Sequence, residues 1–206
     1  MEQMSDQQRL DFFLTADCRG MTDEELQITV LSLLKESRVN HVLGCAQTAV
    51  RLAQIWGADE RDAWRAGILH DVTKALPGDM QLQLSDSYGL HLDDFSRENP
   101  KTIHAITGAA VAQRVFGENE AVVSAIDSHT TGKKNMNTLE KIIYIADYME
   151  PNRSFEGVEQ LRQLAETDLD AALKMGLEMT IALLRQQGRV ICSRSLEALE
   201  KENEKC

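Results

Sequence analysis

Residues 67–77 read GILHDVTKALP and combine an apolar segment with charged and imidazole side chains. An apolar helix end runs into the adjacent pair His70 and Asp71, and Lys74 follows one turn later. Upstream, small and apolar residues recur at helical spacing from Asp59 onward, which predicts a helix with one buried face. A buried carboxylate is costly unless it is paired or coordinates a cation. The stretch therefore predicts a helical core that ends on a polar site.

Helical periodicity extends over most of the 206 residues. Apolar stripes predict helices near residues 22–34, 39–57, 59–71, 102–116, 121–129, 137–147, 167–188 and 193–201. Capping boxes are predicted at Thr22 with Glu25, at Asn137 with Glu140, and at Thr167 with Asp170. Residues 79–100 carry the weakest pattern and fit a short helix and a loop that ends at Asn99-Pro100, and no run alternates like a strand. The prediction is an all-α, compact bundle of about eight to ten helices over residues 23–206, with an N-terminal extension over residues 1–22.

Composition limits the partners that this chain can bind. The formal net charge of −11 argues against a general nucleic-acid or anionic-membrane partner, because those partners require a basic face. The first 20 residues lack the apolar core of a secretory signal, and no apolar run is long enough to span a membrane. The four cysteines are scattered without a C-x-x-C pair, which is typical of reduced thiols. We therefore expect a cytoplasmic protein with a small-molecule partner.

Four of the five histidines share a predicted helix face with apolar residues, and so does one aspartate. These residues are His41, His70, His104, His129 and Asp147. A single histidine on such a face is more often a core residue, but this set comes from separate helices, and helix bundles build metal sites from inward side chains. Imidazole with carboxylate suits iron, manganese or zinc. The sequence thus favours a metal centre, whereas the fifth histidine, His91, is expected at the surface.

The adjacent pair His70 and Asp71 suggests more than one metal. Neighbouring side chains on a helix point about 100° apart. His70 can therefore bind one cation while Asp71 reaches a position shared with a second. We expect Asp71 to bridge the two.

Four cations lie close in the sequence to these candidate ligands. Arg38 precedes His41 by one turn, and the other three are Lys74, Lys133 and Arg153. Each could instead be a solvated surface charge. In an acidic protein, cations placed beside candidate ligands indicate an anionic substrate, most simply a phosphate.

Five segments carry a resemblance to a known family: RVNH (38–41), LHDVTK (69–74), IHAITGAA (103–110), HTTGK (129–133) and IADYMEPNR (145–153). Their order and spacing resemble the HD-domain metal-dependent phosphohydrolases, and within them the YqeK-type symmetrical bis(5'-nucleosyl)-tetraphosphatases. The resemblance extends from Arg38 to about Gly188. The chain departs from it at Ser128, where the family often has an aromatic residue, so nucleoside stacking at that position has no support.

The resemblance implies an all-helical enzyme that binds two metals, usually iron, and cleaves diadenosine tetraphosphate to two ADP. Carried over by motif, one metal is held by His41, His70, Asp71 and Asp147. The second is held by His104 and His129, with Asp71 bridging. Phosphates would be contacted by Lys74, Lys133 and Arg153, and Arg38 would support the first metal or the substrate.

We hypothesise that a hydroxide bridging the two metals attacks an inner phosphorus of the tetraphosphate. Asp71 and Lys74 are the candidate catalytic residues, and Lys74 would be the charge partner or proton donor of the leaving group. Two alternatives stay open: an HD-family nucleotidase or phosphodiesterase acting on another nucleotide, or a non-catalytic nucleotide-binding helical module with a structural metal. Manganese or another transition metal could replace iron, and a homodimer is also left open.

Overall fold

The computed structural model describes residues 4–204, and within them the chain is helical with no strand. The α-helices are α1 (Asp6–Thr15), α2 (Asp23–Leu33), α3 (Glu36–Trp56), α4 (Glu60–Leu69), α5 (Gly78–Tyr88), α6 (Asp94–Glu98), α7 (Ile103–Arg114), α8 (Glu120–Ser128), α9 (Thr138–Met149), α10 (Val158–Thr167), α11 (Leu169–Gln186) and α12 (Ser193–Asn203); a 3-10 helix, η1 (Pro100–Thr102), precedes α7. The all-α prediction is confirmed. The predicted number of helices was too low, because residues 79–100 form α5 and α6, and α10 was not foreseen.

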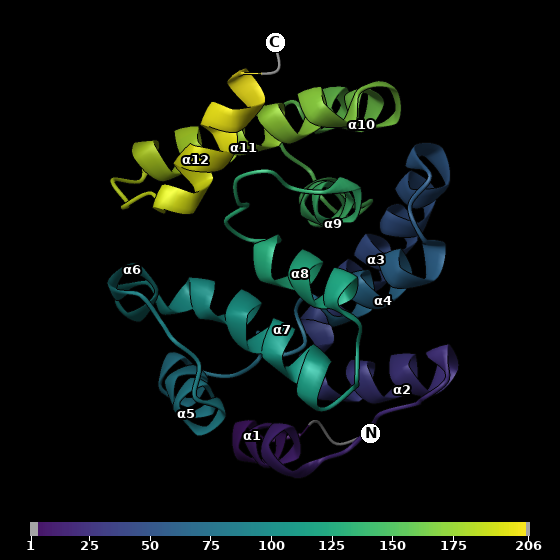
Figure 1. The fold of residues 1–206 in the computed structure, drawn as a ribbon, viewed down its shortest axis with the longest axis vertical. Coiled ribbons are helices and arrows are strands. Elements are labelled where there is room, and N and C mark those ends of the chain that lie inside the picture. Colours follow the sequence, from purple (N-terminus) through teal and green to yellow (C-terminus); the bar gives the residue numbers. More distant parts are fainter. Residues whose placement is uncertain (1–3, 205–206) are drawn as a thin grey trace.

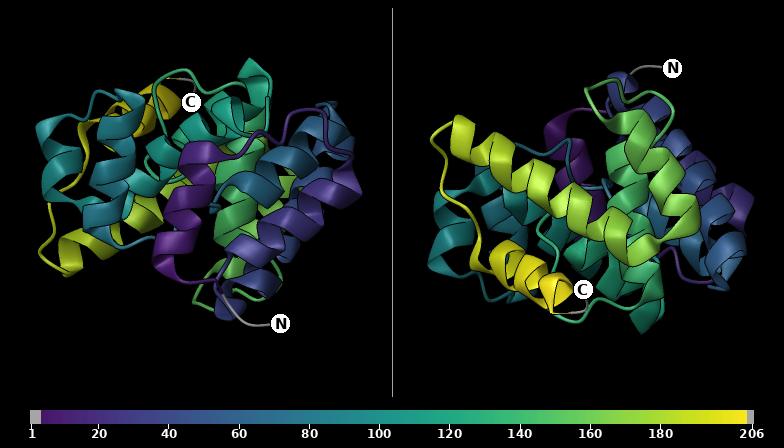
Figure 2. Two further views of the ribbon diagram at one scale, coloured as in Figure 1. Left: turned by 90° about the horizontal axis from the view of Figure 1, so that it is seen from below. Right: turned by 90° about the horizontal axis from the view of Figure 1, so that it is seen from above.

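The helices are arranged in layers around α9 (Figure 1). Helices α10, α11 and α12 lie above α9, the pair α7 and α8 crosses below it, and α1 and α5 form the lower edge. Figure 2 shows α11 and α12 side by side across the upper face. One continuous apolar core joins the layers, from Leu10 in α1 to Ala198 in α12.

Two of the three predicted capping boxes are present. Thr22 accepts the backbone N–H of Glu25, and Asn137 accepts that of Glu140, with the glutamate reaching back in both cases. The box at Thr167 and Asp170 was wrong. Asp168 is the N-cap of α11, and Thr167 is the last residue of α10, where its hydroxyl donates to carbonyls of its own helix.

A glycine lets the two helices that carry the first histidines come together. A Cβ at Gly67 would lie 2.6 Å from the backbone Cα of Ala46, a distance that no real side chain shows. Helices α3 and α4 therefore cross at close range. This crossing brings His70, which caps α4, beside His41 in α3.

The N-terminal segment packs against the rest of the chain. Leu10 and Phe13 of α1 are buried in the common core, and the Tyr88 hydroxyl on α5 donates to the Phe13 carbonyl. After α1, the Cys18 amide donates to the Val115 carbonyl at 2.8 Å. The domain boundary at residue 22 stays a prediction. None of the helices within residues 4–204 combines the length and apolarity that a membrane crossing requires.

Candidate metal centre

Six ligand-type side chains from five helices and one turn meet in one buried cluster. The elements are α3 for His41, the end of α4 for His70 and the turn after it for Asp71, and α7, the end of α8 and α9 for the others. His41 Nε2 lies 3.2 Å from His70 Nε2, and His104 Nε2 lies 3.2 Å from His129 Nε2. All four imidazoles are almost fully buried. The structure thus brings together the side chains that the sequence singled out.

The Asp71 carboxylate lies between the two histidine pairs. Its Oδ2 is 3.6 Å from His41 Nε2 and 3.5 Å from His70 Nε2. Its Oδ1 is 3.3 Å from His104 Nε2 and 3.7 Å from His129 Nε2. Each oxygen therefore faces one pair, which is the arrangement that a carboxylate shared by two cations needs.

Asp147 belongs to the first of these groups. Its Oδ1 lies 3.0 Å from His41 Nε2 and 3.8 Å from His70 Nε2. Within each of two sets, His41 with His70 and Asp71, and Asp71 with His104 and His129, one ligand atom per residue lies within 4.8 Å of the others. Two cations could therefore be held, with Asp71 common to both sets.

The orientation of three imidazoles is fixed by carbonyl groups of the preceding turn. His70 Nδ1 donates to the Gly67 carbonyl at 2.7 Å, and His129 Nδ1 donates to the Ile126 carbonyl at 2.6 Å. His104 Nδ1 does the same to the carbonyl of Lys101 at 2.7 Å. A carbonyl oxygen can only accept, so Nδ1 carries the proton in each ring. The Nε2 atoms that face the centre of the cluster are left to bind a proton or a cation.

The cluster fits divalent cations on physical grounds. Burial lowers the pKa of His104 to about 4, so its Nε2 carries a lone pair at neutral pH. Two facing Nε2 atoms at 3.2 Å cannot both be protonated without repulsion. Asp71 Oδ1 is buried and accepts no well-directed hydrogen bond, although Lys74 Nζ lies 3.0 Å away. A cation would satisfy these lone pairs, and the imidazole and carboxylate donors suit a transition metal.

The electrostatic setting also favours positive charge. Burial opposes ionisation of Asp71, but the imidazoles of His70, His104 and His129 hold its pKa well below its usual range. Burial likewise opposes ionisation of Asp147, and His41 and His70 hold the pKa of that carboxyl well below its usual range. Helices α4 and α8 also point their C-terminal ends, which carry partial negative charge, at the cluster.

Glu150 supports the cluster and was not assigned a role from the sequence. It is 1% exposed, and its Oε1 accepts His41 Nδ1 at 3.1 Å. Its Oε2 accepts the Asn152 backbone N–H at 2.7 Å and the Asn152 amide at 2.8 Å. A Cβ at Gly44 would lie 2.6 Å from Oε2, so the glycine leaves room for this carboxylate. The sequence contains both parts of this contact, the segment EPNR (150–153) and the glycine one turn after His41. Only the fold shows that the Glu150 side chain meets this glycine.

Threonine hydroxyls complete the surroundings of the second histidine pair. Thr130 Oγ1 lies 3.2 Å from His104 Nε2 and 3.0 Å from His129 Nε2. Thr73, in the turn after α4, donates to the His104 carbonyl at 3.1 Å. Gln81 of α5 donates to the Thr73 carbonyl at 2.6 Å, which ties α5 to this turn.

Three of the four predicted substrate-binding cations surround the carboxylates. The Arg38 guanidinium donates to Asp71 Oδ2, and Lys74 Nζ lies 3.0 Å from Asp71 Oδ1. Arg153 donates to Asp147 Oδ1 at 2.9 Å. Each of the three side chains is partly exposed, so they lie where an anion could reach them.

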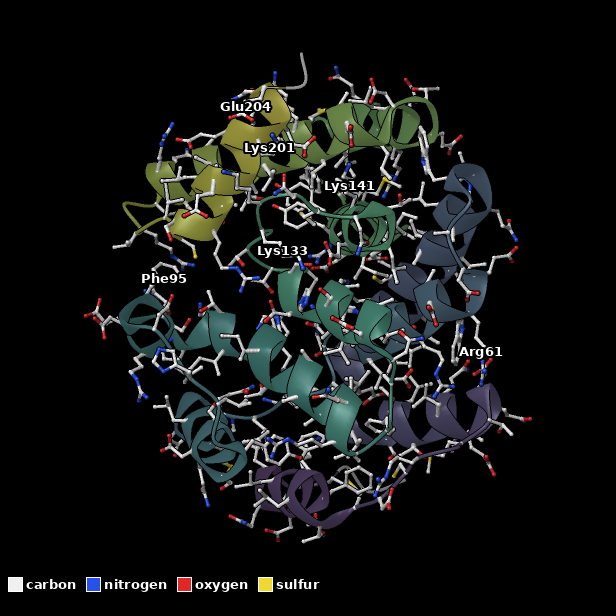
Figure 3. The ribbon with its side chains drawn as sticks, viewed as in Figure 1. Arg61, Phe95, Lys133, Lys141, Lys201 and Glu204 are labelled. Carbon is white, nitrogen blue, oxygen red and sulfur yellow. The ribbon has the colours of Figure 1, made fainter. Side chains whose placement is uncertain are left out.

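Lys133 is placed differently. Figure 3 shows it beside the end of α8, below α12. Its ammonium donates to Ser124 Oγ and to Glu140 Oε1, both at 2.7 Å. Its role in substrate binding stays a prediction. His91 is exposed, as expected.

Known proteins resemble this chain over most of its length. Residues 38–152 match the HD domain family. A protein of Bacillus subtilis, named bis(5'-nucleosyl)-tetraphosphatase, symmetrical, is 40% identical over 174 residues, which cover 83% of this chain and 92% of the relative. A Staphylococcus aureus protein of the same name is 34% identical, covering 82% of this chain and 89% of the relative.

A solved structure has the same fold. It is a Clostridium acetobutylicum protein described as a predicted HD superfamily hydrolase involved in NAD metabolism. It superposes with a TM-score of 0.87 at 38% identity, covering 90% of this chain and 99% of that one. Both the sequence and the arrangement of the helices are therefore shared with these relatives.

Proposed function

The chain belongs to the HD-domain family, and we propose that it is a symmetrical bis(5'-nucleosyl)-tetraphosphatase that cleaves diadenosine tetraphosphate to two ADP. The proposal rests on one observation above all: relatives of that name are 34–40% identical over more than three quarters of this chain. The buried histidine and aspartate cluster supports it, because hydrolases of this family depend on metal ions.

We assign His41, His70, Asp71 and Asp147 to one metal, and Asp71, His104 and His129 to a second. The donor set suits iron, and manganese or another transition metal would fit the same atoms. When bound, such ions would supply an activated water and neutralise charge on the reacting phosphoryl oxygens. Free, buried thiols at Cys18, Cys45 and Cys192 support a cytoplasmic location.

The cations around the cluster are suited to hold the tetraphosphate. Lys74 and Arg153 now neutralise Asp71 and Asp147. If those carboxylates bind metal, both cations become available to phosphate oxygens. Lys74 is the candidate to donate a proton to the leaving phosphate, or to stabilise its charge, because its ammonium lies beside the carboxylate shared by both ligand sets. Arg38 would hold Asp71 or a phosphate. Lys133 would have to leave Glu140 before it could bind a phosphate.

The position of attack distinguishes this activity from that of a general phosphatase. Water adds to one inner phosphorus, the bond from that phosphorus to the oxygen between the two inner phosphorus atoms breaks, and the proton lost by the water balances the one taken up by the leaving phosphate, which gives two nucleoside diphosphates. Attack at an outer phosphorus would give a monophosphate and a triphosphate.

The test is product analysis with metal-loaded protein in ¹⁸O-labelled water. We expect ADP as the sole product of diadenosine tetraphosphate, with label on the terminal phosphate of one ADP of each pair. Equal amounts of AMP and ATP would overturn the assignment. So would hydrolysis of another nucleotide, NAD included, while diadenosine tetraphosphate stays intact, whereas no turnover of any nucleotide would favour the non-catalytic binding module.

A further inference from the structure

A hollow of about 630 Å³ lies beside the candidate metal centre. Its walls come from the end of α9, the turn before α10 and the second half of α11. The residues that matter below are Tyr148, Arg153, Phe155, Met179, Leu183 and Gln186. Its volume falls in the range of small-molecule sites, about 300–1,000 Å³.

The wall is mostly aromatic and apolar. The rings of Tyr148 and Phe155 meet edge to face, with centroids 5.2 Å apart. Met179 adds a flexible thioether, and Leu183 is 49% exposed. Gln186 supplies an amide at the edge. A nucleobase has flat apolar faces and polar edges, so it matches this lining.

Arg153 connects the hollow to the metal centre. Its side chain lines the hollow, while its Nη2 donates to Asp147 Oδ1 at 2.9 Å and its Nε to the Asp147 carbonyl at 3.0 Å. Tyr148 is the next residue after Asp147. A phosphate bound by Arg153 would therefore place the attached nucleoside against the Tyr148 and Phe155 rings.

The other hollows near the cluster have different chemistry. One of about 400 Å³ is lined by Lys74, Lys101 and His104 together with Leu76, Gln81 and Pro100; it has no Phe, Tyr or Trp side chain for a base to stack on, and its two lysines suit phosphate. One of about 250 Å³ contains a single phenyl ring, Phe95, and its volume is below the range of small-molecule sites. The hollow between α9 and α11 is thus the best candidate for a base.

We infer that this hollow receives one nucleobase of the substrate, stacked on Phe155 and Tyr148, with Arg153 on the adjoining phosphate. The inference rests on the proposed function. It makes the site asymmetric, since the two ends of a symmetric substrate are held by different chemistry. One nucleoside should then be sufficient for tight binding.

Two substitutions test the inference without touching the candidate ligands. Phe155→Ala removes a stacking surface, and Leu183→Glu places a charge in the hollow at an exposed helix position, where we expect a small effect on stability. Matched controls are Phe95→Ala in the smaller hollow and Leu196→Glu, at a position 37% exposed on α12. The measurements are the KM for diadenosine tetraphosphate, the Kd for ADP by calorimetry, and inhibition by inorganic tetraphosphate, which has no base.

We expect both variants to raise KM and the Kd for ADP by about 5-fold to 100-fold, the range for loss of one stacked base. Inhibition by inorganic tetraphosphate should stay within about twofold of wild type, and the controls should behave as wild type. Unchanged ADP binding in both variants, or an equal loss for inorganic tetraphosphate, would overturn the inference. Calorimetry with ADP separates the two proposals. If the wild-type protein does not hydrolyse diadenosine tetraphosphate, the proposed function is wrong. The base site is still tested, because the Kd for ADP of the variants does not depend on hydrolysis.

Discussion

Replacing Glu150 with glutamine tests how the first histidine is held. In the folded protein, one Glu150 oxygen accepts His41 Nδ1–H and the other accepts two N–H donors of Asn152. Glu150→Gln keeps the size of the side chain but turns one acceptor into a donor. Glu150 is 1% exposed, so water cannot compensate.

Both orientations of the new amide lose contacts. With its oxygen toward His41, the NH₂ group faces the two N–H donors of Asn152. With its NH₂ group toward His41, the ring must move its proton to Nε2, the atom that faces the cluster. A buried hydrogen bond to a charged group contributes about 1.5–3 kcal/mol. Partners of this kind typically change metal affinity by about 10–100-fold, or about 1.4–2.8 kcal/mol.

The assay is calorimetric titration of metal-free protein with Mn²⁺. We expect Glu150→Gln to weaken one binding event by about 10–100-fold and to leave the other unchanged. The matched control is Glu140→Gln, because Glu140 is 2% exposed and binds Ser124 and Lys133 but no histidine. Wild-type affinity for both ions in Glu150→Gln, or an equal loss in Glu140→Gln, would refute the reasoning.

Further substitutions test the sharing of Asp71 by two ions, the contact of Arg153 with phosphate, the close approach of Gly44 to Glu150, and the pH dependence of stability at Glu140. Asp71→Asn should lower the affinity for both ions, as measured in the same titration, because each of its oxygens faces one histidine pair. Arg153→Ala should lower the rate on diadenosine tetraphosphate by about 10²–10³ with metal content retained by elemental analysis. Gly44→Ala, whose Cβ would lie 2.6 Å from Glu150 Oε2, should reproduce the metal loss of Glu150→Gln with little change in urea stability, because alanine favours the helix by about 1 kcal/mol. Burial opposes ionisation of Glu140, but Lys133, Ser124 and Asn137 lower its pKa below 4.5. The contribution of the Glu140 carboxylate to the free energy of unfolding is therefore present above pH 4.5 and is lost as the pH falls further. Urea unfolding should therefore show Glu140→Gln approaching wild-type stability as the pH falls below 4.5.

Local signals in the sequence predicted most of the helical framework. The caps at Thr22 and Asn137 depend on residues three positions apart, and both are present. The cap at Thr167 was wrong because α10 runs up to that residue, and the apolar stripe of α10 was not recognised. Residues 79–100 were ambiguous because the two helices there are short or polar on their exposed sides.

The candidate site was harder to predict where contacts join distant residues. Order and spacing of the motif residues picked out the six clustered side chains, because each motif is local. The contact between His41 and Glu150 joins residues 109 positions apart, and it depends on how the turn after α9 reaches back to α3. The pairing of Lys133 with Glu140 likewise depends on the packing of the loop after α8 against α9.

The order of the cluster along the chain has a consequence for synthesis. Proteins emerge from the ribosome from the N-terminus onward. Asp71, His104 and His129 are all present once residue 129 has emerged. The set around His41 is complete only after Asp147 has emerged, followed by Glu150, which accepts the hydrogen bond of His41 Nδ1. A nascent chain thus contains all residues of its two ligand sets at different lengths, and the set of Asp71, His104 and His129 is complete first.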